Sequence, residues 1–595
     1  MNDNIHSKNR QNLIHSMFAS AVFGVVLSEL SSGVANIVDG IITSRYLGSL
    51  ALSALGLSGI CYSLLSIVSG IISAGAQQIY CSELLDGKEG RKHNTFAKTI
   101  TLTLPIALLI MVLGIFTSDL LASAVGAPAD TGILHDSVRN YMIGVLLGAP
   151  AFILTPVLIP AVQLNGDNKL ISLSLTVLIA TDVLGDLLNV TLFHGGIFGI
   201  GLASALSYYA SVSVLCISFF KKSSMFKLGL KLPDKFIIQK IFDTGLPKAT
   251  KRLCNFIRPL FINNMIMLAG GSIAMAAFSV EQNLKNFTEA MGAGIAGASF
   301  LMTGVFLREH YPDALRFVAK SATRAIILGV GSFSVLYFLT APLLARIYLT
   351  ADSPSFAPAV FVLRCHAVSL PFLAFNEYYF NIVQASRKLK LSHMITVLEK
   401  LVFIVSTSFI LSRMFGVNGL WLAIPVSEFL LCISILLCTA IRNRKNPMRT
   451  SRFSFVDDRD GERLPRVEVT VTSPEDLPHG QEKIHNFCLE QGFSPKTTYI
   501  IQLFFEELCM TIIRHGFFDA QKHFIEIRVF HAKDKILLRS TDNCKTFTYQ
   551  ERQMMFDRLE ADEYLGINMI SKMAKDVNYV DMLKINHFSI TIEPK

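Results

Sequence analysis

Charged residues are scarce in this chain of 595 residues. Asp, Glu, Lys and Arg make up 17% of it, hydrophobic residues make up 51%, and the mean hydropathy is +0.46. A soluble protein of ordinary composition carries about 25% charged residues. Windows of about 20 uncharged residues recur as far as Arg442, and this pattern predicts a membrane protein followed by a soluble C-terminal part.

Several motifs are also missing. The ten cysteines are scattered without a CxxC pair, so neither a zinc site nor a disulfide framework is expected, and no metal ligands are assigned. A Walker-A motif is absent, which argues against an ATP-driven pump. The N-terminus "MNDNIHSKNRQNLIHS" lacks a small-residue cleavage site. We therefore expect the first membrane helix to act as the targeting element.

About twelve apolar segments have the length of a membrane-spanning helix. They cover residues 16–44, 51–80, 96–118, 137–163, 169–193, 197–220, 241–268, 272–306, 317–345, 357–385, 390–412 and 417–441. Lys and Arg cluster before the first segment and after the second, sixth, tenth and twelfth. By the positive-inside rule, both termini are cytoplasmic in a multi-pass plasma-membrane protein. The same clustering explains the net charge of +9 without nucleic acid as a partner.

The halves of the membrane part resemble each other at an offset of about 220 residues, as in "FGIGLASAL" and "FGVNGLWLA". Repeat halves with a cavity between them are typical of secondary transporters. The fold class predicted is a polytopic α-helical membrane protein of two six-helix repeats with a soluble α/β domain. The expected parts are an N-terminus (1–15), lobe 1 (16–220), a linker (221–240), lobe 2 (241–445), a second linker (446–464) and a cytosolic domain (465–595).

A polar stripe runs down one face of the first helix, because its members are three or four residues apart. They are Ser28, Ser32, Asn36, Asp39 and Thr43. A charge in hydrocarbon costs at least about 2.5 kcal/mol, so the stripe should face protein or water. We interpret Asp39 as a cavity-facing carboxylate with Asn36 beside it. The alternative is an aspartate at the helix end that reaches the outer headgroups.

The fifth segment carries Asp182, Asp186 and Asn189 on one helical face. Two carboxylates one turn apart in a low dielectric cannot cheaply both ionise, so one should hold a proton or share a cation. This predicts a proton or sodium switch. The alternative is one functional aspartate and one that cavity water solvates.

The second half has charges at spacings of four: Glu281, Lys285 and Glu289. Such a ladder is either a structural network lining a wet cavity or a coupling site. Glu377 and Arg258 are further candidates for buried charge, whereas Glu399 and Glu428 lie near other polar groups. Aromatic residues lining a central cavity would suit flat cationic drugs.

The stretch "VDGIITSRYLGSLALSALGLS" resembles the first-helix signature of the multidrug and toxic compound extrusion (MATE) family. "AVQLNGDNKLISL" and "DLLNVTLFHGGIFGIGLASALS" are similar to two later stretches of that family. The resemblance covers roughly residues 12 to 445. It implies an antiporter of twelve helices that expels organic, often cationic compounds in exchange for protons or sodium. The resemblance also implies that transport requires no cofactor. Asp39 matches the family's ion-coupling aspartate.

The match departs from one branch of the family after Asn189, where Phe193 and His194 stand in place of Asp and Pro. Asp182 or Asp186 would then substitute for the usual carboxylate. A second possibility in the same superfamily is a flippase for lipid-linked saccharides, which lines its cavity with Arg and Lys. Few deep basic residues are present here, so the extrusion function is favoured.

The C-terminal part predicts strands at "RVEVTVTS" and "HFIEIRVF" and a helix at "KTTYIIQLFFEELCMTIIRHG". It resembles the GHKL ATPases, particularly the anti-sigma-factor serine kinases, over residues 465 to 595. Three departures occur at functional positions, because Thr511, Cys544 and Tyr564 replace an Asn and two Gly residues. The nucleotide-binding positions that the resemblance implies are Glu507, Thr511, Asp542 and Gly566.

We therefore expect weak or absent ATP hydrolysis, with ATP and Mg²⁺ as possible ligands, because side chains at the glycine positions restrict the approach of phosphate. The tail is interpreted as a regulatory module that binds a cytosolic protein. The hypothesis overall is a secondary antiporter, not an enzyme, for drug-like organic cations in a lipid membrane. The alternative from another class is a signalling protein with a transporter-derived body and a kinase-like output domain.

Overall fold

The computed structural model describes residues 18–19, 21–23, 25–26, 30, 37–85, 89–165, 167–221, 226, 229, 231–245, 250–308, 312–386, 388–444, 465–516, 523–532, 535–544, 573–582 and 585–593. The chain divides into two compact units. The helical unit comprises residues 22–301 and 319–445, and the tail unit comprises residues 1–21, 302–318 and 446–595.

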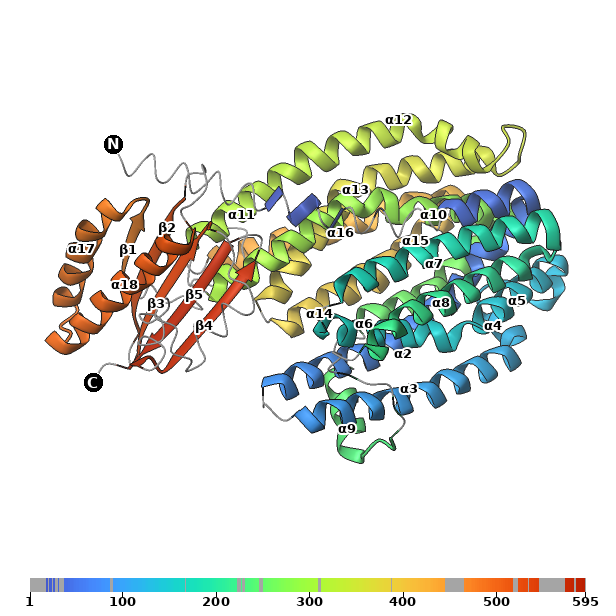
Figure 1. Ribbon diagram of the computed structural model, residues 1–595. Coiled ribbons are helices and arrows are strands. Elements are labelled where there is room, and N and C mark those ends of the chain that lie inside the picture. Colours follow the sequence, from blue (N-terminus) through green and yellow to red (C-terminus); the bar gives the residue numbers. More distant parts are fainter. Residues whose placement is uncertain are drawn as a thin grey trace. The chain divides into compact units, whose positions relative to one another are not determined.

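Long apolar helices build the helical unit (Figure 1). Its first half contains η1 (Thr43–Leu47), α2 (Gly48–Leu85), α3 (Glu89–Phe116), α4 (Ser118–Ala124), η2 (Ala129–Thr131), α5 (Ile133–Leu146), α6 (Ala149–Leu164), α7 (Asn168–Leu188), η3 (Asn189–Phe193), α8 (Gly196–Phe220) and α9 (Lys235–Gly245). The second half contains α10 (Thr250–Arg308), α11 (Pro312–Arg324), η5 (Ala325–Val330), α12 (Gly331–Tyr348), α13 (Phe356–Ala385), α14 (Leu389–Val397), η6 (Leu398–Phe403), α15 (Ile404–Phe415) and α16 (Val417–Arg444). The end of α10 from residue 302 and the start of α11 up to residue 318 are assigned to the tail unit.

Within the described residues, nine helices are long and apolar enough to cross a membrane, or ten if the pair 133–146 and 149–163, bent by 45°, is one span. The predicted span 137–163 is therefore interrupted, at Leu147 and Gly148. Two of the nine stretches, 37–76 and 250–304, each cover parts of two predicted spans. Each contains a glycine with positive φ, Gly48 (88°) or Gly271 (62°), a conformation that a side chain disfavours.

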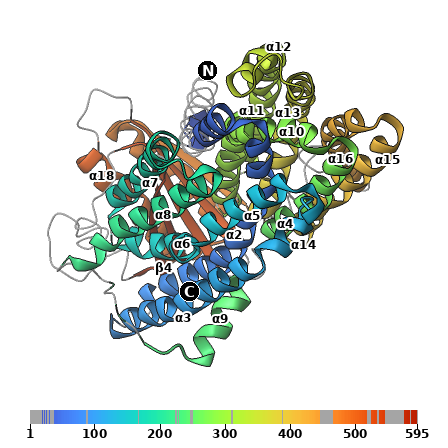
Figure 2. The same ribbon diagram turned by 90° about the vertical axis from the view of Figure 1, so that its right-hand side faces the viewer.

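Each half packs mainly on itself. In lobe 1, α8 lies along α5, α6 and α7, and α2 packs on α5 and α6. In lobe 2, α13 and α15 lie along α16, and α12 packs on α13. Figure 2 shows lobe 1 helices α6, α7 and α8 grouped apart from α15 and α16 of lobe 2. The apolar faces of these helices meet in a shared core that includes Leu57, Val138 and Trp421.

The repeat predicted from the sequence is visible in the backbone of two loops. Asn165 N–H donates to Ala161 O at 3.0 Å and Asp167 N–H to Val162 O at 3.2 Å. In lobe 2, Ser386 N–H donates to Ile382 O at 3.0 Å and Lys388 N–H to Val383 O at 3.2 Å. The two loops thus close the same hydrogen-bonded rings at equivalent positions, which supports two copies of one structural unit.

The tail unit has its own core. Strands β1 (Arg466–Val471), β2 (Ile525–Ala532), β3 (Lys535–Asp542), β4 (Asp576–Met582) and β5 (Ile585–Ile592) form an antiparallel sheet in the order β1-β2-β3-β5-β4. Its other elements are η7 (Pro474–Asp476), α17 (Leu477–Glu490) and α18 (Pro495–Gly516). Alternate residues of β2, such as Ile525 and Ile527, face the apolar side of α18, including Phe504 and Ile512. The predicted strands 466–473 and 523–530 and the predicted helix 496–516 are confirmed.

Candidate functional site

Three carboxyl groups gather inside lobe 1. Asp39 lies just before the π-helical turn η1, and Asp182 and Asp186 lie one turn apart on α7. All three are buried, Asp186 completely. The carboxyl group of Asp39 interacts electrostatically with those of both Asp182 and Asp186. The structure therefore brings together the residues that the sequence singled out on two separate helices.

The surroundings leave these carboxyl groups short of hydrogen bonds. One oxygen of Asp39, one of Asp182 and both of Asp186 have no hydrogen-bond partner among the described residues. Ser204 and Ser207 of α8 lie beside Asp182. Because a buried carboxylate without a partner is costly, the site is suited to a proton or a bound cation. Among the described residues, no three His, Cys, Asp or Glu side chains are placed to hold a metal ion.

Asn189 has a different environment from the carboxyl groups. Its Nδ2 donates to Gly196 O at 2.8 Å, and its Oδ1 accepts from Gly195 N–H at 3.1 Å. An added Cβ on Gly199 would lie 1.8 Å from this Oδ1. The Asn189 amide thus holds the turn between α7 and α8. Asn36, predicted beside Asp39, lies outside the described residues, as do Ser28 and Ser32.

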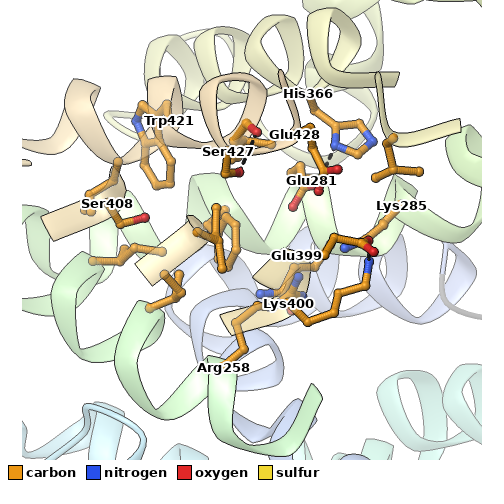
Figure 3. Close-up of a pocket in the computed structure, with 18 of the residues that line it drawn as sticks. Arg258, Glu281, Lys285, His366, Glu399, Lys400, Ser408, Trp421, Ser427 and Glu428 are labelled. Carbon is orange, nitrogen blue, oxygen red and sulfur yellow. Dashed lines mark hydrogen bonds and ion pairs between the residues drawn. The ribbon is translucent and has the colours of Figure 1, made fainter. Parts of the chain in front are cut away.

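In lobe 2, the predicted charge ladder is only half formed. Lys285 Nζ lies 3.6 Å from Glu289 Oε1. Glu281 instead pairs with His366 of α13, whose Nδ1 lies 3.0 Å from Glu281 Oε1 (Figure 3). Both side chains of this pair are at most 5% exposed. The carboxylate of Glu281 therefore contacts His366 on another helix instead of forming an ion pair with Lys285, one turn further along α10.

A cavity of about 70 Å³ lies beside this pair. Its charged lining comprises Arg258, Glu281, Lys285, Glu289, His366, Glu399, Lys400 and Glu428. Lys400 and Glu399 form an ion pair within the π-helical segment η6. Glu428 Oε2 accepts from Asn376 Nδ2 at 2.8 Å. π-Helical turns often mark functional sites, and those at η1, η3 and η6 adjoin or contain the buried charges.

Glu377 is not among the residues lining this cavity. Its Oε1 lies 3.6 Å from Lys251 Nζ, and that ammonium group also lies over the ring of Phe380, 5.6 Å from its centroid. Glu377 is thus compensated by a charge from α10.

The sequence analysis did not weigh His366 or Lys400. Each is a polar residue in a mainly apolar segment, and such a residue indicates a polar or charged partner nearby in the fold. That signal could have found both residues, although it could not have named Glu281 as the partner of His366.

The tail places three of its four predicted nucleotide positions within the described residues. Thr511 and Asp542 are buried and Glu507 is half-buried, whereas Gly566 lies outside the described residues. Asp542 Oδ1 accepts from Asn586 Nδ2 at 2.7 Å and from Cys544 N–H at 3.1 Å. That oxygen is already engaged by Asn586 of β5 and by the backbone of Cys544, two residues further along the chain.

Two helical lobes with buried carboxyl groups define a polytopic membrane transporter. The family model MatE matches residues 25–191 and 247–410, together more than half of the chain. The chain therefore belongs to the MatE family of multidrug efflux transporters. Such transporters are secondary transporters of small molecules, not enzymes, and use ion coupling without a cofactor.

Individual relatives agree with this assignment. Multidrug export protein MepA from a bovine strain of Staphylococcus aureus is 22% identical over 428 residues, which cover 70% of this chain and 92% of that protein. The fold is similar to a multidrug resistance MATE transporter in an inward-facing conformation, with a TM-score of 0.65, 19% identity, and coverage of 72% and 99%. A MOP superfamily transporter from Pyrococcus furiosus gives a TM-score of 0.56, 20% identity, and coverage of 73% and 97%.

Proposed function

We propose that this protein is an antiporter that exports organic cations or other amphipathic compounds in exchange for protons or sodium ions. The observation that carries the proposal is the buried group of Asp39, Asp182 and Asp186 with carboxyl oxygens that lack hydrogen-bond partners among the described residues. Binding a proton or a cation lowers the free energy of such buried oxygens.

Coupling follows if the ion and the substrate favour different states. An ion bound at Asp39 and a carboxyl of α7 joins two helices and stabilises one access state. A substrate that binds the other state better shifts the population the opposite way. The lobes contact each other through Arg45, whose Nε donates to Ile347 O at 2.9 Å, and through Ser53, whose Oγ donates to Ser272 O at 2.9 Å. These contacts must break for the lobes to separate at this place.

We also propose that the chain crosses the plasma membrane twelve times with both termini in the cytoplasm. Support comes from Gly48 and Gly271, which kink the two longest apolar stretches at equivalent positions of the repeat. Dividing each stretch at its glycine adds two spans to the ten. An even number of spans agrees with the distribution of Lys and Arg between them.

For the tail we propose a GHKL-like fold that regulates transport by binding a cytosolic protein and has little or no ATPase or kinase activity. The five-stranded antiparallel sheet with α17 and α18 is compatible with such a fold. The side chain of Cys544, whose backbone N–H donates to Asp542 Oδ1, disfavours the close approach of a nucleotide that a glycine would allow. Isothermal titration of the full-length protein with Mg-ATP should show no saturable binding, and submillimolar binding would overturn this part.

The antiporter is tested in proteoliposomes with an imposed proton or sodium gradient, no ATP, and a panel of fluorescent cationic dyes. We expect gradient-driven dye movement in the wild type and its loss in Asp39→Asn. Asp130→Asn is the matched control, because Asp130 is an exposed aspartate of the same lobe. Equal transport by the wild type and Asp39→Asn would refute the site.

Absence of dye transport under either gradient would contradict the drug-antiporter function. Lipid-linked saccharides would then be assayed as flippase substrates. Phosphorylation of a partner by the tail would instead favour the signalling alternative.

A further inference from the structure

The linker between the two lobes contains the short helix α9, which lies against lobe 1. Its buried side chains Ile237 and Ile241 pack with Leu102 of α3. The backbone of Ile241 comes so close to α2 that an added Cβ on Gly75 would lie 2.4 Å from the Ile241 carbonyl oxygen. Figures 1 and 2 both show α9 beside α3. The linker is therefore held on the surface of lobe 1.

The contacts of α9 coincide with the ends of two apolar stretches. The apolar stretch of α2 ends at Ala76, one residue after Gly75, and that of α3 begins at Thr95. Gln77 and Gln78 follow Ala76 in the sequence. Because the hydrocarbon of a membrane ends where such stretches end, these contacts place α9 at the membrane–water interface. The proposed topology assigns this side of the membrane to the cytoplasm.

The apolar side of α9 is wider than the surface that lobe 1 covers. Ile238 adjoins Ile241 and Phe242 on the helix, because residues three or four positions apart share one face. Ile238 is half-buried, and Phe242 is 37% exposed. Leu232, just before the helix, is 84% exposed. In a helix that lies in the plane of a membrane surface, such side chains are buried among the acyl chains.

The linker is also strongly basic. Residues 221–240 contain six lysines and a single acidic residue, Asp234. Asp234 forms an ion pair with Lys98 of α3. Lys231 and Lys235 are exposed at the start of the helix. Clusters of about four to eight basic residues beside a spanning helix, on its cytoplasmic side, are typical of sites for anionic lipids.

We propose that α9 and the residues just before it bind an anionic phospholipid, with its phosphate on Lys231 and Lys235 and its acyl chains against Leu232 and Phe242. A lysine ammonium group binds phosphate as a compact point charge. The bound lipid adds a second contact that holds the linker on lobe 1, shortly before the chain enters α10 of lobe 2. This interaction surface is separate from the buried carboxyl groups and does not depend on the antiporter function.

Quenching of tryptophan fluorescence by brominated lipids measures which lipid contacts α9. Phe242→Trp supplies the reporter, and the wild type gives the background from Trp421, the single native tryptophan, which is 1% exposed. The full-length protein is reconstituted in vesicles of phosphatidylcholine and phosphatidylglycerol in equal amounts. Bromine is placed on the acyl chains of one lipid or of the other, so the two sets of vesicles differ only in the label.

We expect phosphatidylglycerol to be enriched at least about fivefold over phosphatidylcholine beside the Phe242→Trp reporter, the factor for one lysine at an anionic surface. High salt should reduce this enrichment, because it screens exposed charges. Lys231→Gln combined with Lys235→Gln should abolish the enrichment, whereas the two Lys→Arg substitutions should retain it. The backbone N–H of Lys231 donates to Thr101 Oγ1 at 2.9 Å, a contact that these substitutions keep.

Lys320→Gln combined with Lys390→Gln is the matched control, because it removes two exposed lysines of lobe 2. The control pair should leave the enrichment unchanged. An equal reduction by the control pair would overturn the proposal, since that result indicates a general effect of net charge.

Equal quenching by the two brominated lipids would overturn the proposal and would mean that the linker lysines only orient the chain in the membrane. Absence of quenching by either lipid would also overturn it, because α9 would then lie away from the membrane. These measurements use neither an ion gradient nor a transported dye. Their failure would therefore leave the antiporter function untouched, and a failure of dye transport would leave the lipid site untouched.

Discussion

The guanidinium group of Arg45 in lobe 1 donates from Nε to the carbonyl oxygen of Ile347 in lobe 2 at 2.9 Å. Its NH2 group donates to the neighbouring carbonyl of Arg346. These acceptors belong to the last turn of α12, whose C-terminal carbonyls have no partner within the helix. Arg45 therefore caps a helix of the other lobe and joins the two halves just beyond the Asp39 segment.

Arg45→Gln should loosen this junction. The contact is exposed, so we expect a loss of about 1 kcal/mol and roughly fivefold faster hydrogen exchange in residues 43–53 and 345–350. Hydrogen–deuterium exchange with mass spectrometry measures this effect. Arg346→Gln is a matched control, because it removes an arginine side chain but keeps the backbone acceptor. Unchanged exchange in Arg45→Gln would show that the contact does not hold the lobes together.

The two aspartates of α7 should differ in their effect on coupling. Asp186 is fully buried and both of its oxygens lack a hydrogen-bond partner among the described residues, whereas Ser204 and Ser207 lie beside Asp182. We expect Asp186→Asn to abolish gradient-driven dye transport and Asp182→Asn to retain part of it. Initial rates of dye transport in proteoliposomes under matched gradients measure which of the two variants loses more transport. The reverse ranking would assign the coupling role to Asp182.

The Glu281–His366 pair should stabilise lobe 2 as a unit. His366 Nε2 lies 3.0 Å from Thr288 Oγ1, so both ring nitrogens have partners. Removing one member of a buried hydrogen-bonded pair costs about 2 kcal/mol, because the other member loses its partner. Glu281→Gln and His366→Gln should each lower the thermal unfolding midpoint. The double variant should lower it by less than the sum of the two single effects.

Lys285→Gln is the control for this comparison of the two single variants with the double variant. Lys285 and Glu289 are partly exposed and 3.6 Å apart, so its loss should cost less than about 1 kcal/mol. Additive effects of Glu281→Gln and His366→Gln would mean that the two residues do not interact.

Asn189 should act on stability and not on ion coupling. Asn189→Ala removes the two hydrogen bonds that hold the turn from α7 to α8, at an expected cost of about 2 kcal/mol in unfolding free energy. Thr191→Ala, in the same turn, removes only a hydroxyl bonded to Leu187 O and should cost less. Thermal unfolding measures both. The folded fraction of Asn189→Ala should still transport dye in response to the gradient, and a properly folded but uncoupled variant would contradict this role.

Much of the architecture follows from local sequence patterns. The apolar segments predict helices because hydropathy and helical length are properties of neighbouring residues. Asp39, Asp182 and Asp186 stand out for the same reason, since a carboxylate in an apolar stretch needs an explanation. The internal repeat could also be predicted from the sequence. The backbone hydrogen bonds of Asn165 and Asp167 recur at Ser386 and Lys388.

Only the tertiary structure decided which charges meet. Spacing alone assigned Glu281 to Lys285, whereas the folded chain gives it to His366 on α13. Spacing also grouped Asn189 with the aspartates, although its amide closes a turn instead. Helical periodicity orders residues along one helix, while the partner of a charge depends on how different helices pack.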